Sequence, residues 1–140
     1  MSGQPLPRFV SLRAGEVNMR SGPGVQYPVD WVYKRRYLPV EVIAAFQTWR
    51  KVRDHQGTQG WVHQSMLGSD RTAIVLGRMR TVRAAADANS RALAKLEPDV
   101  IIQVLQCPDE NGWCRVRASG FEGWLRRVEI WGIRSGEIVK

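Results

Sequence analysis

Two histidines and two cysteines are the side chains in this sequence most suited to nucleophilic, acid–base or metal chemistry. They are His55, His63, Cys107 and Cys114. A Cys–His nucleophile pair would require residues from distant parts of the chain to meet, and the C-x6-C spacing with two separated histidines does not match a zinc site. No HExxH, GxSxG, P-loop or paired-carboxylate pattern is present. We therefore expect no enzymatic activity, no cofactor and no metal.

The two cysteines flank a loop that joins two predicted antiparallel strands. A bridge between Cys107 and Cys114 would close a ring of about eight residues and contribute roughly 2.5 kcal/mol in the chain-entropy description. Strand alternation counted from Val104 places Cys107 on the outer face, whereas Cys114 shares a face with Val116, and an irregular loop would remove this conflict. The sequence predicts a disulfide and an oxidising compartment; the alternative is two small buried thiols.

Aromatic and basic residues form a third group, one that could bind a ligand. Rings beside arginine suit sugars, stacked bases or peptides with acidic groups. The alternative is that the rings pack inside a small domain, which we favour for Trp61 and Trp124. The group consists of Tyr27, Tyr33, Tyr37, Trp49 and Trp61, near the basic run Lys34, Arg35 and Arg36.

The charge of the chain restricts its partners. The 140 residues carry a formal charge of +8, and 17 of the 21 basic residues are arginine. This balance favours acidic partners such as nucleic acid, anionic lipid or anionic wall polymer, although a GC-rich genome would give the same composition with solvated charges. No window approaches the roughly 18 apolar residues of a transmembrane segment.

The N-terminus leaves the compartment open. Met1, Ser2 and Gly3 resemble a remnant of expression, and residues 1–7 are expected to be disordered. No charged and apolar leader precedes them, so a secreted protein without its signal peptide and a cytosolic protein would begin alike. With the disulfide, we expect a periplasmic or secreted protein, and a cytoplasmic one is the alternative.

Two halves of the sequence read alike at an offset of about 63 positions. Order and spacing are kept throughout, which indicates tandem domains. We place the first domain at 8–76 and a more divergent second domain at 77–140. The matching segments are Trp49–Arg53 with Trp113–Arg117, Gly60–Val62 with Gly123–Leu125, and Val17–Arg20 with Arg80–Arg83.

Short strands separated by turns predict an all-β fold. Val40, Val42, Val52, Met19 and Val62 alternate so that they would face one small core. Residues 72–76 are expected to supply the last strand of the first domain, and 130–133 the closing strand of the second. The segments 21–38 and 84–96 are interpreted as long irregular hairpin loops, although the second is rich enough in alanine to pass for a helix.

These motifs resemble the bacterial SH3 domain. The resemblance rests on Glu16–Gly24, Leu38–Val42, Trp49–Arg53 and Gly60–Val62, whereas the second half keeps only the later motifs. It implies two tandem five-stranded, partly open barrels. It also implies a protein that is exported, associated with the envelope and non-catalytic.

The resemblance also suggests where a ligand binds. Trp49 and Trp113 match the tryptophan of the peptide groove in eukaryotic SH3 domains. His63 and Met66 replace the proline and tyrosine of that groove, and Arg126 and Glu129 replace them in the second half. Because polyproline docking needs parallel aromatic slots, we do not expect it. The candidate ligand-binding residues are Tyr27, Lys34, Arg35, Arg36, Tyr37, Trp49, Trp61, His63 and Met66.

The sequence therefore predicts a non-catalytic binding module of the bacterial envelope. Its first domain would recognise cell-wall glycopeptide or an envelope protein. The alternative is a nucleic-acid-binding protein built from small basic barrels, whose affinity would fall steeply with salt.

Overall fold

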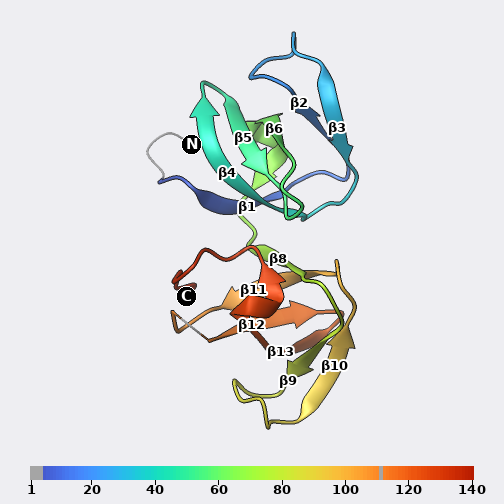
Figure 1. Cartoon of the computed structure of the whole chain (residues 1–140), viewed down its shortest axis with the longest axis vertical. Coiled ribbons are helices and arrows are strands. Elements are labelled where there is room, and N and C mark those ends of the chain that lie inside the picture. The colour runs from blue at the N-terminus through green and yellow to red at the C-terminus, as the bar shows by residue number, and fades with distance from the viewer. Residues whose placement is uncertain (1–4, 111) are drawn as a thin grey trace. The chain divides into compact units, whose positions relative to one another are not determined.

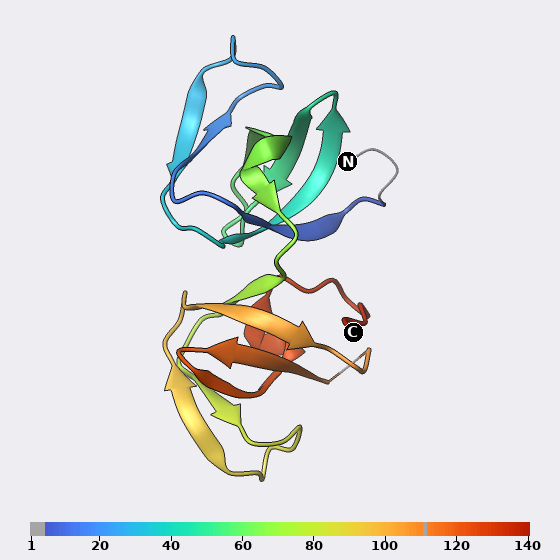
Figure 2. The ribbon, with the colours of Figure 1, turned by 180° about the vertical axis from the view of Figure 1, so that it is seen from behind.

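The computed structural model describes residues 5–110 and 112–140 and divides the chain into two compact units, Met1–Asp70 and Arg71–Lys140. Figure 1 and Figure 2 show them from two sides. Each unit is one antiparallel sheet, so the predicted all-β class is confirmed. The expected disordered segment 1–7 falls mainly on residues outside the described part, and the first strand begins at Arg8.

The first unit is a seven-stranded sheet in the order β3-β2-β6-β5-β4-β1-β7. Its elements are β1 (Arg8–Leu12), β2 (Val17–Arg20), β3 (Val29–Tyr33), β4 (Pro39–Phe46), β5 (Trp49–Arg53), β6 (Gln59–His63), the 3-10 helix η1 (Gln64–Met66) and β7 (Leu67–Gly68).

The second unit repeats this topology strand for strand in the order β10-β9-β13-β12-β11-β8-β14. Its elements are β8 (Thr72–Val75), β9 (Arg80–Arg83), β10 (Ala92–Leu96), β11 (Ile101–Gln106), β12 (Trp113–Ala118), β13 (Phe121–Arg126), the 3-10 helix η2 (Arg127–Glu129) and β14 (Ile130–Trp131).

Strand β8 corrects one prediction. The segment 72–76 was expected to close the first barrel, but β8 pairs with β11 and β14 of the second sheet. It occupies the place that β1 holds in the first unit, where β7 is the closing strand. All four residues of β8 are buried, and such an apolar run would fit the core of either barrel. Its composition therefore does not say which sheet it joins.

The two predicted irregular loops also contain strands. Val29–Tyr33 forms β3 against β2, and Ala92–Leu96 forms β10 against β9. Both pairs contain a register shift, which breaks the simple alternation that marks a strand in sequence. Each sheet consequently has seven strands where the prediction had five.

The predicted core of the first unit is present. Met19, Val40, Val42, Val52 and Val62 are each at most 1% exposed. They lie on β2, β4, β5 and β6, so one alternate face of each strand covers the same interior.

A glycine lets two strands approach closely in each unit. A Cβ on Gly60 would lie 2.6–2.9 Å from side-chain atoms of Met19. A Cβ on Gly123 would lie 2.5 Å from Val82 and 2.7 Å from the carbonyl oxygen of Arg83. The Gly-Trp motif of both halves therefore allows β6 to pack on β2 and β13 to pack on β9.

A β-bulge decides where Cys107 points. The register between β11 and β12 shifts between Val104 and Gln106, and a bulge reverses the alternation beyond it. Cys107 and Cys114 are both fully buried in the second core, beside Val116 and Leu125. The conflict expected from strict alternation is absent for this reason.

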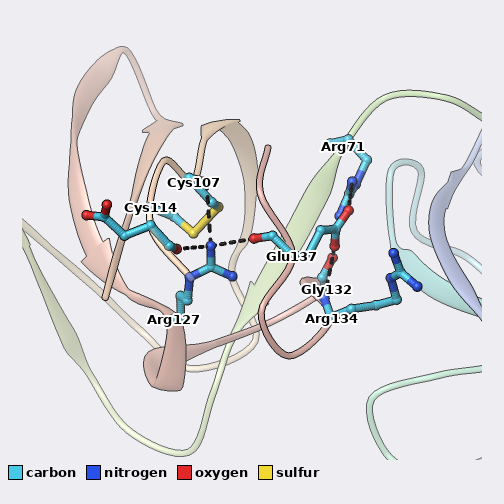
Figure 3. The surroundings of a disulfide bond; sticks show 8 residues. Arg71, Cys107, Cys114, Arg127, Gly132, Arg134 and Glu137 are labelled. Atoms are coloured by element: carbon cyan, nitrogen blue, oxygen red, sulfur yellow. Dashed lines mark hydrogen bonds and ion pairs between the residues drawn. A yellow bond between two sulfur atoms is a disulfide. The ribbon is translucent and has the colours of Figure 1, made fainter. Parts of the chain in front are cut away.

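The two cysteines are joined by a disulfide, with Cα atoms 4.3 Å apart. Figure 3 shows its surroundings, where Nη2 of Arg127 donates to the carbonyl oxygens of Cys107, Asp109 and Glu137. Cys107 also exchanges two backbone hydrogen bonds with Val139. The disulfide loop and the C-terminal segment are thus fastened to η2 by one guanidinium group.

Candidate functional site

An outer face of the first unit gathers aromatic and basic side chains. In this sheet Trp49 of β5 lies directly opposite Phe46 of β4 and His63 of β6. Residues that are paired in this way share one face of a sheet. The Trp49 and His63 rings meet edge to face at 5.4 Å between centroids, and Phe46 is 50% exposed.

The next row of this outer face contains a tryptophan between two cations. Trp61 of β6 lies opposite Lys51 on one side and Arg20 of β2 on the other. Trp61 is half-buried and points away from the core, as the alternation of β6 requires. The interpretation of Trp61 as a core residue is therefore wrong, and its indole is available at the surface.

Arg20 connects this face to the turn that carries Tyr27. Its Nη1 donates to the carbonyl oxygens of Val25 at 3.2 Å and Tyr27 at 3.0 Å. The Tyr27 ring lies against Gly22, where an added Cβ would be 2.5 Å from the ring. The Ser-Gly-Pro-Gly motif therefore makes room for this ring, which remains 39% exposed.

Tyr37 lies elsewhere in the unit. It lines a hollow of about 610 Å³ together with Leu12, Arg13 and Leu67. Its backbone is left-handed, with φ of 69°, and its N–H donates to the carbonyl oxygen of Leu12 at 2.9 Å. The guanidinium of Arg36 stands 5.1 Å from the centre of the Tyr37 ring.

The remaining candidate residues occupy the borders of these places. Lys34 forms an exposed ion pair with Glu16 at 3.6 Å, which contributes little to stability. Arg35 is exposed. Met66 ends η1, the helix that begins beside His63, and its carbonyl oxygen accepts from the N–H of Arg13. The structure thus brings Trp49, Trp61 and His63 together on the outer face and places Arg36 and Tyr37 at a separate hollow.

Three members of this surface are not among the nine predicted residues. They are Arg20, Phe46 and Lys51, and they follow from pairing the strands around Trp49 and Trp61, since alternation alone places Lys51 beside both. Trp31 of β3 is also exposed, but it lies opposite the buried Met19 and therefore does not share the outer face.

The second unit repeats the arrangement with different chemistry. Trp113 of β12 lies opposite Arg126, whose guanidinium stands 5.1 Å from the centre of the indole. Trp124 lies opposite Arg115 on one side and Arg83 on the other. Like Trp61, Trp124 points outward and is half-buried, so the expectation that it packs in the core is also wrong.

Residues 13–68 and 77–132 each match the family model of the bacterial SH3 domain. The chain belongs to the bacterial SH3 domain family. The two units are therefore two tandem SH3 domains, as their common strand order indicates.

The individual relatives share little sequence identity with this chain. The putative N-acetylmuramoyl-L-alanine amidase YrvJ of Bacillus subtilis (strain 168) is 27% identical over an alignment of 128 residues, and the match covers 79% of this chain and 24% of the relative. The chain thus spans about a quarter of the length of that protein. Two solved structures, NlpC1 and NlpC2 from Trichomonas vaginalis, are 10% identical with TM-scores of 0.41 and 0.40. The alignments cover 93% and 92% of this chain and 47% and 49% of those chains.

The helices of the described residues are short. None is long and apolar enough to cross a bilayer. Both cysteines are used in the disulfide, so neither supplies a thiolate to a histidine.

Proposed function

We propose that this protein is a non-catalytic binding module of the bacterial cell wall and that its first SH3 domain holds peptidoglycan-derived material. The family assignment supports a binding role. The relative's name describes an enzyme that acts on the bond between N-acetylmuramic acid and L-alanine, and the similarity is confined to about a quarter of that enzyme.

The outer face of the first domain is the observation that carries this proposal. Trp49, His63 and Phe46 offer adjoining ring surfaces, which suit the apolar faces of sugars and peptide side chains. The neighbouring row places Lys51 and Arg20 on either side of Trp61. Cations in this position suit the carboxylates of wall peptides. The face therefore combines the two kinds of contact that a glycopeptide offers.

The disulfide supports an extracytoplasmic location. Disulfides persist in oxidising compartments such as the periplasm and the cell exterior. Cys107 and Cys114 are both fully buried and bonded. We infer that the protein works in the periplasm or outside the cell, where wall material is found.

The test compares two tryptophans at equivalent places in the two domains. Trp49→Ala and Trp113→Ala are titrated against purified peptidoglycan from which phosphate polymers have been removed. Loss of a central aromatic anchor typically costs 2 kcal/mol or more, about thirtyfold in affinity. We expect a loss of that size for Trp49→Ala and less than about threefold for Trp113→Ala, with circular dichroism unchanged in both.

Other results would contradict this assignment in distinct ways. Equal losses of affinity, or a loss confined to Trp113→Ala, would contradict the assignment of the binding site to the first domain. Arg126→Ala serves as a second comparison and should also have little effect on this material. Tighter binding to an oligonucleotide than to peptidoglycan, with a steep fall in salt, would favour the nucleic-acid alternative.

A further inference from the structure

The second SH3 domain contains a hollow lined by arginines. It has a volume of about 490 Å³ and adjoins Trp113 and Val128. Four arginines from the β8–β9 connection, β9 and β13 line it, and Glu129 is the single acidic residue among the described lining residues. The arginines are Arg78, Arg80, Arg83 and Arg126.

Glu129 neutralises only a small part of this charge. One of its carboxylate oxygens lies 3.9 Å from Arg80 Nη1, and the other accepts from the backbone N–H of Arg126 at 2.8 Å. Arg83 donates one N–H to the carbonyl oxygen of Ser90 at 3.1 Å. Arg78 is exposed and forms no ion pair with any described residue. A net charge of about +3 therefore remains around the hollow, which concentrates anions there.

Two arginines of β12 in the same sheet are paired. Arg115 and Arg117 both bind the carboxylate of Glu122, the latter at 2.8 Å. These bonds lower the pKa of Glu122, with the hydrogen bond from Arg117 as the largest cause. The excess of cations is thus local to the hollow and is not a general property of the domain surface.

A second hollow of about 640 Å³ adjoins the first. Trp113, Arg126 and Val128 line both. The second hollow adds Arg127 and Arg134, with Glu110 among its lining residues. Nη2 of Arg127 donates to backbone carbonyl oxygens, and its Nε and Nη1 are buried, so the cations of this hollow that face a ligand come from Arg126 and Arg134. A ligand with repeated anionic groups can place one group in each hollow.

The first domain keeps one of these four arginines at the equivalent positions, because Arg20 lies opposite Trp61 as Arg83 lies opposite Trp124. His63 stands where the second domain has Arg126, and Val17 stands where it has Arg80, according to the strand pairing in each sheet. The second domain therefore presents more cations at these positions than the first.

We propose that these adjoining hollows bind the phosphate groups of an anionic envelope polymer, one whose chain carries phosphates at regular intervals. A guanidinium fork matches a phosphate in bidentate geometry, and a tetrahedral phosphate can accept from arginines on different sides, whereas a carboxylate accepts mainly in its plane. This site is separate from the one proposed for the first domain.

A phosphate polymer without bases fits the site better than a nucleic acid does. Single-stranded nucleic acids bind through bases stacked on open aromatic rings as well as through phosphates. The Trp113 ring is half-buried and already has the Arg126 guanidinium 5.1 Å from its centre. The phosphate contacts remain possible, but no open platform for a base adjoins them.

The experiment measures binding of fluorescently labelled long-chain inorganic polyphosphate to the intact, oxidised chain by anisotropy at two or more salt concentrations. Arg78→Gln is compared with Arg117→Gln, and the double variant Arg78→Gln/Arg126→Gln is compared with Arg115→Gln/Arg117→Gln, so that each comparison removes the same number of charges. We expect a loss of at least tenfold for Arg78→Gln/Arg126→Gln and less than threefold for Arg115→Gln/Arg117→Gln. The slope of log K against log salt should fall by about one for each hollow arginine removed.

Several results would overturn the proposal. An equal loss for Arg117→Gln would show that binding follows overall charge. If monomeric phosphate binds as tightly as the polymer, the site is not specific for a polymer. If polyglutamate binds as tightly as polyphosphate, the surface recognises carboxylates, and if single-stranded DNA does so, it recognises nucleic acid. Arg78→Gln keeps the test valid if the double variant misfolds, because the Arg78 side chain is exposed and forms no ion pair with a described residue. Binding of Trp49→Ala to polyphosphate should be unchanged, which separates this test from that of the first domain.

Discussion

Asp54 holds the turn between β5 and β6 of the first domain. This residue is 5% exposed, and its Oδ2 accepts from the hydroxyl of Tyr33 at 2.9 Å. Oδ1 accepts from the N–H groups of Gln56 at 2.9 Å and Thr58 at 3.0 Å. Burial, and then the bond to Asp54, raise the pKa of Tyr33 above its ordinary value, so Tyr33 stays a donor.

Replacing Asp54 should therefore destabilise the first domain. Asp54→Ala leaves the buried Tyr33 hydroxyl and the N–H groups of the exposed turn residues Gln56 and Thr58 without their acceptor, and we expect the free energy of unfolding to fall by about 2–3 kcal/mol. Asp30→Ala, at an exposed position of β3, should change it by less than about 0.5 kcal/mol. Urea unfolding measures both, and a similar small effect for the two variants would show that the Asp54 bonds contribute little.

Glu137 gives the second domain a dependence on pH. It forms a bidentate pair with Arg71 at 2.6 and 3.0 Å and accepts from the N–H of Arg134 at 3.0 Å. Burial raises its pKa, but the bonds from Arg71 and Arg134 outweigh this effect, so the pKa lies below its ordinary value of 4.5.

A carboxyl whose pKa is lower in the folded state stabilises that state above the unfolded pKa and loses this contribution as pH falls through the folded value. We expect the wild type to be more stable than Glu137→Gln at pH 7 and the difference to shrink from about pH 4.5 downward. Thermal unfolding of both proteins across this range measures it. A difference that does not change with pH would contradict the role of the carboxylate charge.

At the scale of elements, the glycine of the Gly-Trp motif has different neighbours in the two domains. A Cβ at position 60 would meet only side-chain atoms of Met19, which is unbranched and adaptable. A Cβ at position 123 would meet the backbone oxygen of Arg83 at 2.7 Å as well as Val82. A flexible side chain can move aside, but a paired strand cannot move without loss of its hydrogen bonds.

We therefore expect Gly123→Ala to cost clearly more stability than Gly60→Ala. Overpacking of this kind typically costs 1–3 kcal/mol, and we expect Gly123→Ala at or above the upper end of that range. Gly15→Ala, where no atom lies within 4 Å of the added Cβ and φ is not positive, controls for the change from glycine to alanine alone. Equal costs at positions 60 and 123 would mean that Met19 is as rigid as the backbone.

The sequence was sufficient to predict the strands that alternate simply. Val40, Val42 and Val52 identified the core because one face of each strand is apolar. Register shifts hid β3 and β10 for the opposite reason. All residues of β8 are buried, so its sequence pattern fits either domain. Its pairing with the second sheet therefore could not be predicted from the local sequence.

The candidate site was predictable only in part, and for a related reason. Trp49, Trp61 and His63 were identified one by one, and their grouping required the register of β5 and β6. Tyr37 was grouped with them by type, yet it lines a different hollow. The arginines of the second domain come from three elements, so their spacing in sequence conceals their grouping in space.

At the scale of the whole molecule, the two domains solve the same structural problem differently. In the first, Arg50 of β5 is buried and donates to Gln64 of η1. In the second, Cys114 stands at the corresponding place in β12, and Arg127 of η2 donates back to the disulfide loop. The arginine is therefore on the strand in the first domain and on the 3-10 helix in the second, where the strand position holds the disulfide-bonded Cys114.

Reduction of the disulfide should consequently affect one domain. The ring of about eight residues predicts a loss of roughly 2.5 kcal/mol for the second domain. Amide hydrogen exchange in the oxidised and reduced protein would follow core amides such as those of Val62 and Val116 separately. We expect protection to fall at Val116 and not at Val62. Alkylation before reduction should detect no thiol, and two free thiols in oxidised protein would contradict the pairing.

The bulge in β11 has a counterpart in β4, where the register shifts between Val42 and Ala44. In the first domain the third residue after Val42 is Ala45, which is exposed and lies opposite Arg50. In the second domain the third residue after Val104 is Cys107, which is buried and bonded to Cys114. Trp113 follows Val104 by nine positions, whereas Trp49 follows Val42 by seven, so the second loop is two residues longer. The same bulge therefore adjoins a tight turn in one domain and a longer, covalently closed loop in the other.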